Sequence, residues 1–260
     1  MRKIIVHYHI FKNAGTSIDE ILKKSFGSKW MNFDENPVEG SILPKKIEEV
    51  ILKNPDLKAI SSHLLVPPLP NQTLEVFPIV ILRHPIDRAY SAYLFEWQKQ
   101  AGTDTPKGSF DEFIDSKLQY KNKNAIQNYQ TFHLANTSYE KLNIFDKEIS
   151  EEETLERAKS FVDTLPCIGF VEHYSEYLKQ LALHFRPHFP KLDILEYRLN
   201  ALQSEEMNIY QKLNEIRKVC SKEHYEKLVL ANILDLRLYE YAQAVSKLIT
   251  SRSDKSATSF

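Results

Sequence analysis

The stretch from Lys3 to Ser17 reads KIIVHYHIFKNAGTS, and it decides how the fold begins. Its first half is an apolar run typical of a buried β-strand, and its second half is a short loop that leads into a helical pattern from Ile18. The loop holds a lysine, a glycine and two hydroxyl side chains. Backbone N–H groups at a helix start have no partner, and the helix dipole is positive there. The stretch therefore predicts a phosphate-binding loop between a strand and a helix.

The residues of this loop have different expected roles in binding a phosphate. Lys12 supplies a full charge, and Thr16 and Ser17 can donate hydrogen bonds to phosphate oxygens. Gly15 lets the backbone come close to the ligand. The common nucleoside-triphosphate loop, G-x-x-x-x-G-K-[ST], has a different order, because here the lysine stands three positions before Gly15 and no glycine opens the loop. An ATP-type loop is therefore a poor match.

A second apolar run, 76–82, leads directly into the sequence RHPIDRAYSAY, which begins at Arg83. Pro85 and Asp87 suit the first turn of a helix, so Arg83 should stand where the strand ends. Ser91 then lies about two helical turns further on. An arginine fork with a hydroxyl can hold a terminal phosphate. The alternative is an ion pair from Arg83 to Asp87 beside an incidental serine.

The two segments together resemble the donor-binding elements of sulfotransferases. The order Lys-x-Ala-Gly-Thr-Ser resembles their 5′-phosphosulfate loop, and Arg-x-Pro-x-x-Arg-x-x-Ser-x-Tyr resembles their 3′-phosphate element. Segments 169–174 and 232–242 resemble late elements of the carbohydrate-type families, which include heparan sulfate 2-O-sulfotransferase-like and bacterial sulfotransferase-family proteins. The chain departs from the family pattern at Phe11 (usually proline), Asn13 (usually threonine) and His84 (commonly aspartate).

The resemblance implies a donor and the residues that hold it. The donor would be 3′-phosphoadenosine 5′-phosphosulfate (PAPS), the product would be 3′-phosphoadenosine 5′-phosphate (PAP), and no metal would be needed. The positions that match the donor-binding motifs are Lys12, Asn13, Ala14, Gly15, Thr16, Ser17, Arg83 and Ser91. Lys12 would also be catalytic, because it would stabilise the charge on the departing phosphate.

His63 is the second catalytic candidate. It follows the apolar run 57–62 and opens a proline-rich loop, where related glycan sulfotransferases have a Gly-His or Ser-His pair that supplies the general base. An imidazole suits this role because its pKa lies near neutrality. The alternative is a histidine that only hydrogen-bonds the loop.

Other polar residues are interpreted as structural. We interpret His9 as structural and expect Arg88 to pair with acidic neighbours, and we keep His84 as a further candidate whose charged form Arg83 would disfavour. The remaining histidines lack ligand spacing and no Cys/His cluster occurs, so no metal site is expected. A polar helix face is the interpretation for Asn128, Gln130 and Thr131. Lys117, Lys121 and Lys123 form a local basic patch, for which an anionic acceptor and a solvated face are equally good interpretations.

Strands that alternate with helices predict an α/β protein, a P-loop-like three-layer fold whose central, mostly parallel sheet is flanked by helices. Lys12, His63 and Arg83 each follow a strand, so we expect them at one edge of the sheet. Residues 1–250 should form a single domain and 251–260 a disordered tail. The expected strands are 3–10, 57–62, 76–82 and 167–171, with a short edge strand at 194–197. The expected helices are 17–26, 44–53, 85–100, 110–118, 123–134, 153–165 and 174–186, and a helical remainder reaches about 250.

Composition limits the partners. With 34 basic and 35 acidic residues the net charge is −1, so no global field attracts nucleic acid. The two cysteines, Cys167 and Cys220, form no disulfide framework and suit a reducing compartment. No apolar run has the length of a membrane span and no signal peptide is apparent, so we expect a soluble cytoplasmic protein, compatible with a bacterial origin.

The sequence is compatible with three functions. The first is sulfuryl transfer from PAPS to an acceptor hydroxyl, on a sugar or polysaccharide, by in-line displacement with a histidine base. The second is an ATP-using, kinase-like P-loop enzyme, and the third is a catalytically inactive nucleotide-binding scaffold of the same fold. Nothing in the sequence names the acceptor or the oligomeric state. The loops 27–43, 64–75, 101–108 and 135–152 are the expected walls of the acceptor site.

Overall fold

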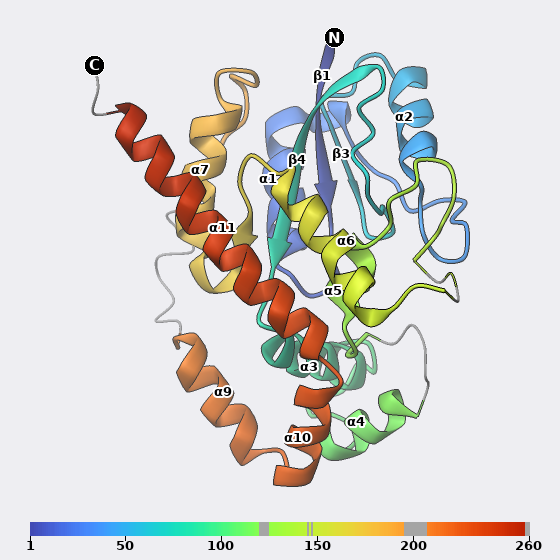
Figure 1. Cartoon of the computed structure of the whole chain (residues 1–260), viewed down its shortest axis with the longest axis vertical. Helices are drawn as coiled ribbons and strands as arrows, with labels where there is room; N and C mark the ends of the chain where they lie inside the picture. The colour runs from blue at the N-terminus through green and yellow to red at the C-terminus, as the bar shows by residue number, and fades with distance from the viewer. Residues whose placement is uncertain (120–124, 145, 147, 195–206, 258–260) are drawn as a thin grey trace.

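A central sheet organises the computed structural model, which describes residues 1–119, 125–144, 146, 148–194 and 207–257 (Figure 1). All strand pairs in these residues are parallel, in the order β2-β3-β1-β4-β5. The predicted fold class is therefore confirmed. The strands are β1 (Arg2–Tyr8), β2 (Trp30–Asn32), β3 (Ala59–Ser62), β4 (Leu74–Leu82) and β5 (Gly169–Phe170).

Strand β1 is central because its side chains are apolar on both faces. Ile4, Ile5 and Val6 are fully buried, as expected for a strand of a parallel sheet covered on both sides. At the end of β1, Tyr8 pairs with Ser62 of β3 and with Val80 of β4. The chain order reverses around β1, and in open α/β sheets ligands bind where such a reversal occurs.

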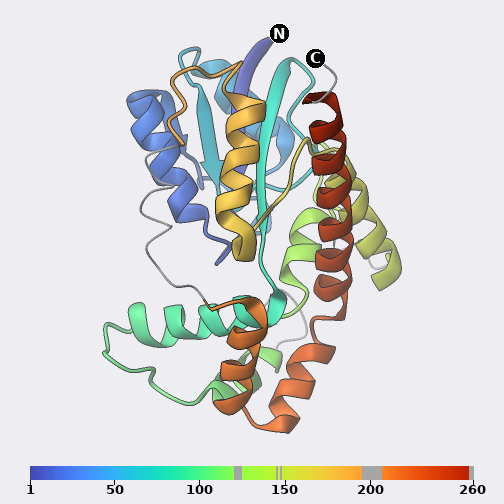
Figure 2. The ribbon, with the colours of Figure 1, turned by 90° about the vertical axis from the view of Figure 1, so that its left-hand side faces the viewer.

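Helices cover both faces of the sheet. Ile5 and Ile81 face a core formed with α1 (Gly15–Phe26) and α7 (Tyr174–Phe185). Val6 and Val80 face the opposite core, which is larger. Figure 2 shows the sheet between these two layers. The helices of the larger core are α2 (Pro44–Lys53), α5 (Tyr129–Leu134), α6 (Glu151–Asp163) and α11 (Ile233–Ala257).

A second group of helices lies beyond the carboxyl ends of the strands, in the lower part of Figure 2. Ile86, Phe110, Phe113, Ile216 and Leu228 form its separate apolar core. This group of helices therefore lies next to the edge of the sheet that carries the predicted site residues. Its elements are α3 (Pro85–Leu94), the π-helical turn η2 (Phe95–Lys99), α4 (Phe110–Leu118), α9 (Ile209–Lys218) and α10 (Lys222–Leu230).

Several element boundaries differ from the sequence predictions. The helix expected over 85–100 changes to a π-helical turn after Leu94, and β5 has only two residues of the predicted 167–171. Helix α5 begins at Tyr129, and positions 123 and 124 of the predicted helix 123–134 lie outside the described residues. The short turns η1 (Gly27–Lys29) and η3 (Val171–His173) are 3-10 helices.

The chain's end is helical beyond residue 250. Helix α11 continues to Ala257 through most of the stretch for which composition predicted disorder, because each residue added to an existing helix gains a hydrogen bond. Residues 258–260, and 195–197 of the predicted edge strand, lie outside the described residues, and Ile194 is not in a strand. Among the described helices none is both long and apolar enough to cross a membrane.

Candidate active site

The loop between β1 and α1 has the backbone geometry of an anion cradle. Lys12 and Ala14 have left-handed backbones, with φ of 66° and 59°. Left-handed residues at alternate positions turn successive N–H groups toward one point and form a concavity that binds anions. Non-glycine residues in this region are strained, and such strain concentrates at ligand clamps. The loop therefore has a backbone compatible with an anion, and phosphate binding there stays a prediction.

The side chain of Asn13 does not line this cradle. It is 1% exposed, and its Nδ2 donates to the backbone carbonyl of Ile81 at 2.8 Å and to Gln130 Oε1 at 2.7 Å. Asn13 therefore anchors the loop to β4 and α5, and its backbone N–H donates to the Ile10 carbonyl at 3.2 Å.

Gln130 fastens both predicted donor elements to α5. Its Oε1 also accepts from the backbone N–H of Arg83 at 3.0 Å, and its Nε2 donates to the Arg83 carbonyl at 2.9 Å. Asp235 of α11 accepts from the backbone N–H of Gln130 at 3.1 Å and from the hydroxyl of Thr131 at 2.7 Å. Gln130 and Thr131, for which the sequence predicts a polar helix face, are instead buried and connect α5 to its neighbours.

Arg83 lies against the phosphate loop. Its Nη1 donates to the backbone carbonyl of Lys12 at 3.1 Å, and its Nε forms an ion pair with Asp87 at 2.7 Å. The ion pair that was the alternative interpretation is thus present, while the described residues offer no hydrogen-bond partner to Nη2. Ser91 is half-buried on α3, and its hydroxyl has no hydrogen bond to any described residue.

Lys12 brings positive charge to the cradle. Its Nζ lies over the ring of Phe95 at 4.3 Å, and it forms no ion pair within the described residues. Burial lowers the pKa of the Lys12 ammonium, and the charges of Arg83 and Lys99 lower it further. The three cations together make this edge of the sheet attractive to an anion.

His63 is bonded to a carboxylate that the sequence analysis missed. Its Nδ1 lies 2.9 Å from Asp34 Oδ2, and Asp34 Oδ1 accepts from the His63 backbone N–H at 2.7 Å and from Ser62 Oγ at 2.9 Å. Burial by itself would raise the pKa of Asp34, but the hydrogen bonds from His63 and Ser62 outweigh it and hold that pKa below its usual value. Asp34 is therefore ionised near neutral pH.

A second histidine–carboxylate group lies behind His63. The ring of His9 stacks on that of His63 with centroids 3.8 Å apart. Asp19 of α1 bonds Nδ1 of His9 at 2.7 Å through one oxygen and Nδ1 of His7 at 2.8 Å through the other. These bonds outweigh the effect of burial and hold the pKa of Asp19 well below its usual value, while burial lowers the pKa of His7.

His7, His9 and Asp19 are also the residue types of a metal site. Their ligand atoms lie within 4.8 Å of one another, a grouping that the sequence analysis did not foresee. The nitrogen–oxygen distances of 2.7 and 2.8 Å are hydrogen-bond distances, and each Asp19 oxygen is taken by one imidazole. The arrangement is that of a hydrogen-bonded cluster. Its signal in the sequence is the spacing of His7 and His9, which puts them on one face of β1.

Three minor predictions need correction. Arg88 does not pair with a carboxylate: it is fully buried over the ring of Tyr129 at 4.8 Å, and its guanidinium has no hydrogen-bond partner in the described residues. Burial, and not Arg83, lowers the pKa of His84 to about 4. Lys117 is paired with Glu96 instead of being solvated, and positions 121 and 123 lie outside the described residues.

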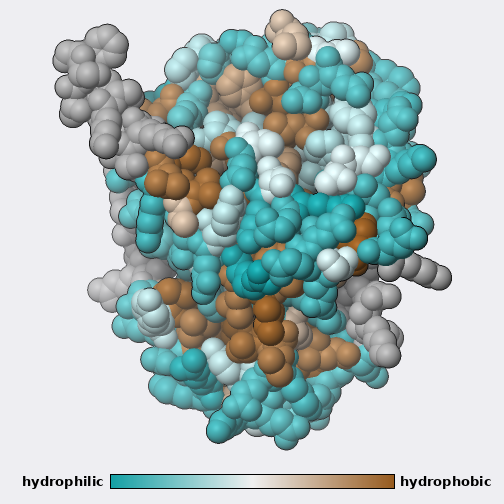
Figure 3. Space-filling view, viewed as in Figure 1, coloured by the Kyte–Doolittle hydropathy of each residue, from teal (hydrophilic) through white to brown (hydrophobic). Residues whose placement is uncertain are grey.

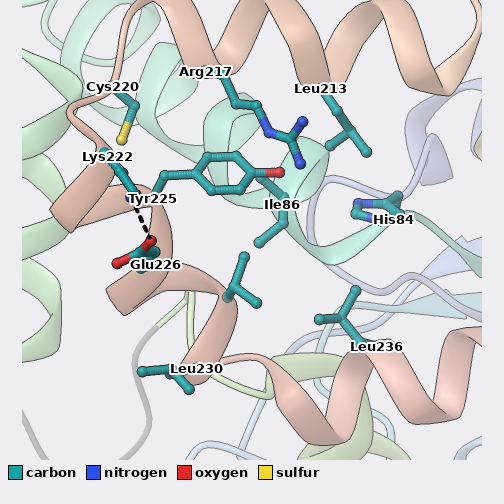
Figure 4. Close-up of a pocket in the computed structure, with 11 residues that line it drawn as sticks. His84, Ile86, Leu213, Arg217, Cys220, Lys222, Tyr225, Glu226, Leu230 and Leu236 are labelled. Carbon is teal, nitrogen blue, oxygen red and sulfur yellow. Dashed lines mark ion pairs between the residues drawn. The ribbon is translucent and has the colours of Figure 1, made fainter.

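Two hollows adjoin the site. The first, about 320 Å³, lies between the phosphate loop at Ala14 and Ser17 and the segment 171–176. The second, about 840 Å³, begins at His84 and lies between α3, α9, α10 and α11. Figure 4 shows the Arg217 guanidinium next to the Tyr225 ring in it, and Figure 3 shows the apolar surface around it. Both hollows open beside the carboxyl edge of the sheet.

The fold and the site together define an α/β protein with a left-handed loop between β1 and α1 and a neighbouring imidazole–carboxylate pair. The model of the sulfotransferase family matches residues 2–242, so the chain belongs to the sulfotransferase family. It is accordingly a PAPS-dependent transferase. An uncharacterised protein of Archaeoglobus fulgidus is 29% identical over 252 residues, 92% of this chain and 95% of the relative.

Among solved structures, a crystal structure of a fungal RNA kinase is similar at 12% identity and a TM-score of 0.31. It covers 79% of this chain and 98% of the kinase chain. Similarity at this level supports no argument about fold or function.

Proposed function

We propose that this protein transfers the sulfuryl group of PAPS to a hydroxyl of a carbohydrate, with Lys12 and His63 as its catalytic residues. The proposal rests on one observation: three features lie together at the carboxyl edge of the sheet. These are the left-handed turns of the phosphate loop, the Arg83 contact to Lys12, and the Asp34-bonded imidazole of His63.

The chain's residues fit the two phosphates of the donor. The N–H groups of Gly15 and Thr16 and the hydroxyls of Thr16 and Ser17 would hold the 5′-phosphate, because the first N–H groups of a helix lack partners and Thr16 is exposed. The N–H of Ser17 donates to the Ala14 carbonyl at 3.2 Å. Arg83, through its free Nη2, and Ser91 would hold the 3′-phosphate. When bound, PAPS supplies an activated sulfuryl group.

His63 would act as the general base. Because Nδ1 faces the Asp34 carboxylate, Nε2 is left to accept the proton of the acceptor hydroxyl. The acceptor oxygen then bonds to sulfur while the bond from sulfur to the 5′-phosphate oxygen breaks. Lys12 would stabilise the negative charge that this oxygen gains. The side chain of His63 is 40% exposed, as a group that meets an acceptor must be.

The proposal of a carbohydrate acceptor rests on the resemblance of segments 169–174 and 232–242 to the carbohydrate-type families. Glu172 in the first segment accepts from the backbone N–H of His84 at 2.7 Å, so this segment supports the start of α3 and with it Arg83. The net charge of −1 favours a neutral sugar over a heavily sulfated polymer.

The test is transfer of ³⁵S from labelled PAPS to neutral and anionic polysaccharides, with release of PAP measured in parallel. We expect label in a polysaccharide and an equal amount of PAP. Phosphate transfer from γ-labelled ATP in place of sulfate transfer would instead support the kinase alternative, and neither transfer would support the scaffold.

A further inference from the structure

We propose that Asp34 and His9 are positioning residues for the His63 base: Asp34 fixes the proton on Nδ1, and His9 holds the plane of the ring. This inference rests on the proposed function, because it names the residues that would make His63 act through Nε2.

The contacts of Asp34 leave His63 one arrangement. A carboxylate only accepts hydrogen bonds, so the 2.9 Å contact between Asp34 Oδ2 and His63 Nδ1 requires a proton on Nδ1. The other oxygen accepts from the backbone N–H of His63 itself, at 2.7 Å, and therefore ties the carboxylate to the residue that it orients. Asn32 Nδ2 donates to Oδ2 at 3.3 Å and supports it from β2.

His9 restrains the ring from behind. It is 6% exposed and cannot turn freely, because Nδ1 is bonded to Asp19 at 2.7 Å. Gly15 packs close to its ring, since a Cβ at this position would lie 2.1 Å from His9 Cδ2, and the ring of His7 stacks on it with centroids 5.2 Å apart. The ring of His63 thus stacks on a restrained imidazole, while its side chain stays 40% exposed.

This arrangement links the base to the donor. His9 directly follows β1, at the start of the loop to α1, and Gly15, which leaves room for His9, is the first residue of α1. One continuous segment therefore sets the position of the phosphate and of the surface on which the base rests. Alignment of the acceptor oxygen with the donor depends on that shared support.

The experiment compares the wild type with Asp34→Asn, and uses Asp104→Asn in an exposed loop as the matched control. Long-range ¹H–¹⁵N correlation spectra report the tautomer of His63, which is identified by the signals lost in His63→Gln. We expect a proton on Nδ1 in the wild type and a shift to Nε2 in Asp34→Asn, because the new amide can donate to Nδ1.

The second measurement is steady-state kinetics, with the polysaccharide on which the wild type is most active as the acceptor. In Asp34→Asn we expect kcat to fall about 100-fold or more, with the PAP dissociation constant and the thermal midpoint unchanged. His9→Ala should lower kcat less, and His9→Phe, which keeps a planar ring, should recover part of the loss.

The proposal is overturned if Asp34→Asn keeps the proton of His63 on Nδ1 or keeps kcat within about threefold of the wild type. It is also overturned if PAP affinity and thermal midpoint fall together with kcat, because that pattern indicates a merely structural role. The spectra need neither donor nor acceptor. A wild type that fails to bind PAP therefore contradicts the proposed function and leaves the tautomer result to decide the positioning role.

Discussion

Arg83 Nη1 donates a hydrogen bond of 3.1 Å to the backbone carbonyl of Lys12, so the two segments that resemble donor-binding elements touch. Gln130 connects the two segments, because its Oε1 accepts from the side chain of Asn13 at 2.7 Å and from the backbone N–H of Arg83 at 3.0 Å. The two loops therefore form one rigid unit before any ligand is present. Pre-organisation of this kind lowers the entropy that binding must overcome.

Replacement of Lys12 by alanine should abolish transfer. Lys12 is itself part of the turn, with a left-handed backbone, and loss of a group that stabilises the departing charge costs about 10²–10³ in kcat. We expect weaker PAP binding as well, because the loop loses a full charge. The matched control is Lys53→Ala at the exposed end of α2, which should leave both quantities unchanged. A Lys12→Ala variant with wild-type kcat would contradict the catalytic role.

Replacement of His63 by glutamine should separate turnover from binding. Loss of a general base lowers kcat by about 10²–10⁴, while the PAP dissociation constant should stay within about twofold because His63 is not among the residues proposed to hold the donor. The measurements are steady-state kinetics and calorimetry on the same preparation. Equal losses of turnover and PAP affinity would argue that His63 only supports the loop.

Gly15→Ala should destabilise the protein through His9. The new Cβ would lie 2.1 Å from His9 Cδ2, so either the loop or the imidazole must move. Overpacking of this kind costs about 1–3 kcal/mol in the free energy of unfolding. In a His9→Ala background the clash is absent, and the same substitution should cost clearly less. A double-mutant cycle by urea unfolding measures this coupling, and additive effects would show that Gly15 does not act through His9.

Gln130→Leu should loosen the donor site from inside the protein. The change leaves Asn13 Nδ2 and the Arg83 N–H without this acceptor, and a buried unsatisfied group costs about 1–3 kcal/mol. We expect a lower free energy of unfolding and weaker PAP binding, although Gln130 is not expected to touch the ligand. Gln119→Leu on the exposed end of α4 is the control. Unchanged PAP affinity in Gln130→Leu would contradict the role as a connector.

Stability should fall as the pH falls from about 6.5 to 4. Burial lowers the pKa of His133 from 6.5 to about 4, so over this range the unfolded chain binds a proton that the folded protein does not. The free energy of unfolding therefore rises with pH, by up to about 1.4 kcal/mol per pH unit for this group.

The measurement is urea unfolding at several pH values, in the wild type and in His133→Gln. The variant should show a smaller slope, and the exposed His173→Gln should show the wild-type slope. An unchanged slope in His133→Gln would contradict this assignment.

The sequence predicted the parts of this protein that depend on local pattern. Apolar runs located the longer strands, and their parallel order placed Lys12, His63 and Arg83 at one edge. Local pattern was also enough for α2, which spans Pro44–Lys53 as expected. The predicted range of β5, 167–171, is longer than the strand itself because apolar residues continue on both sides of it.

Contacts between distant residues were not predictable in this way. Asn13 and Gln130 are 117 positions apart, and nothing local shows that the amide of Asn13 turns into the core. Asp34 stands in a polar stretch and gains its role only because β2 pairs with β3, which brings it beside His63. The same holds for Asp19, whose two oxygens meet His7 and His9 only after α1 has packed on the sheet.

The most direct test of the account is calorimetric titration with PAP, ADP and ATP, first without and then with magnesium. The account predicts tight binding of PAP that needs no magnesium and is lost in Arg83→Ala. Preference for ATP with magnesium, or equal affinity of Arg83→Ala and the wild type for PAP, would contradict it.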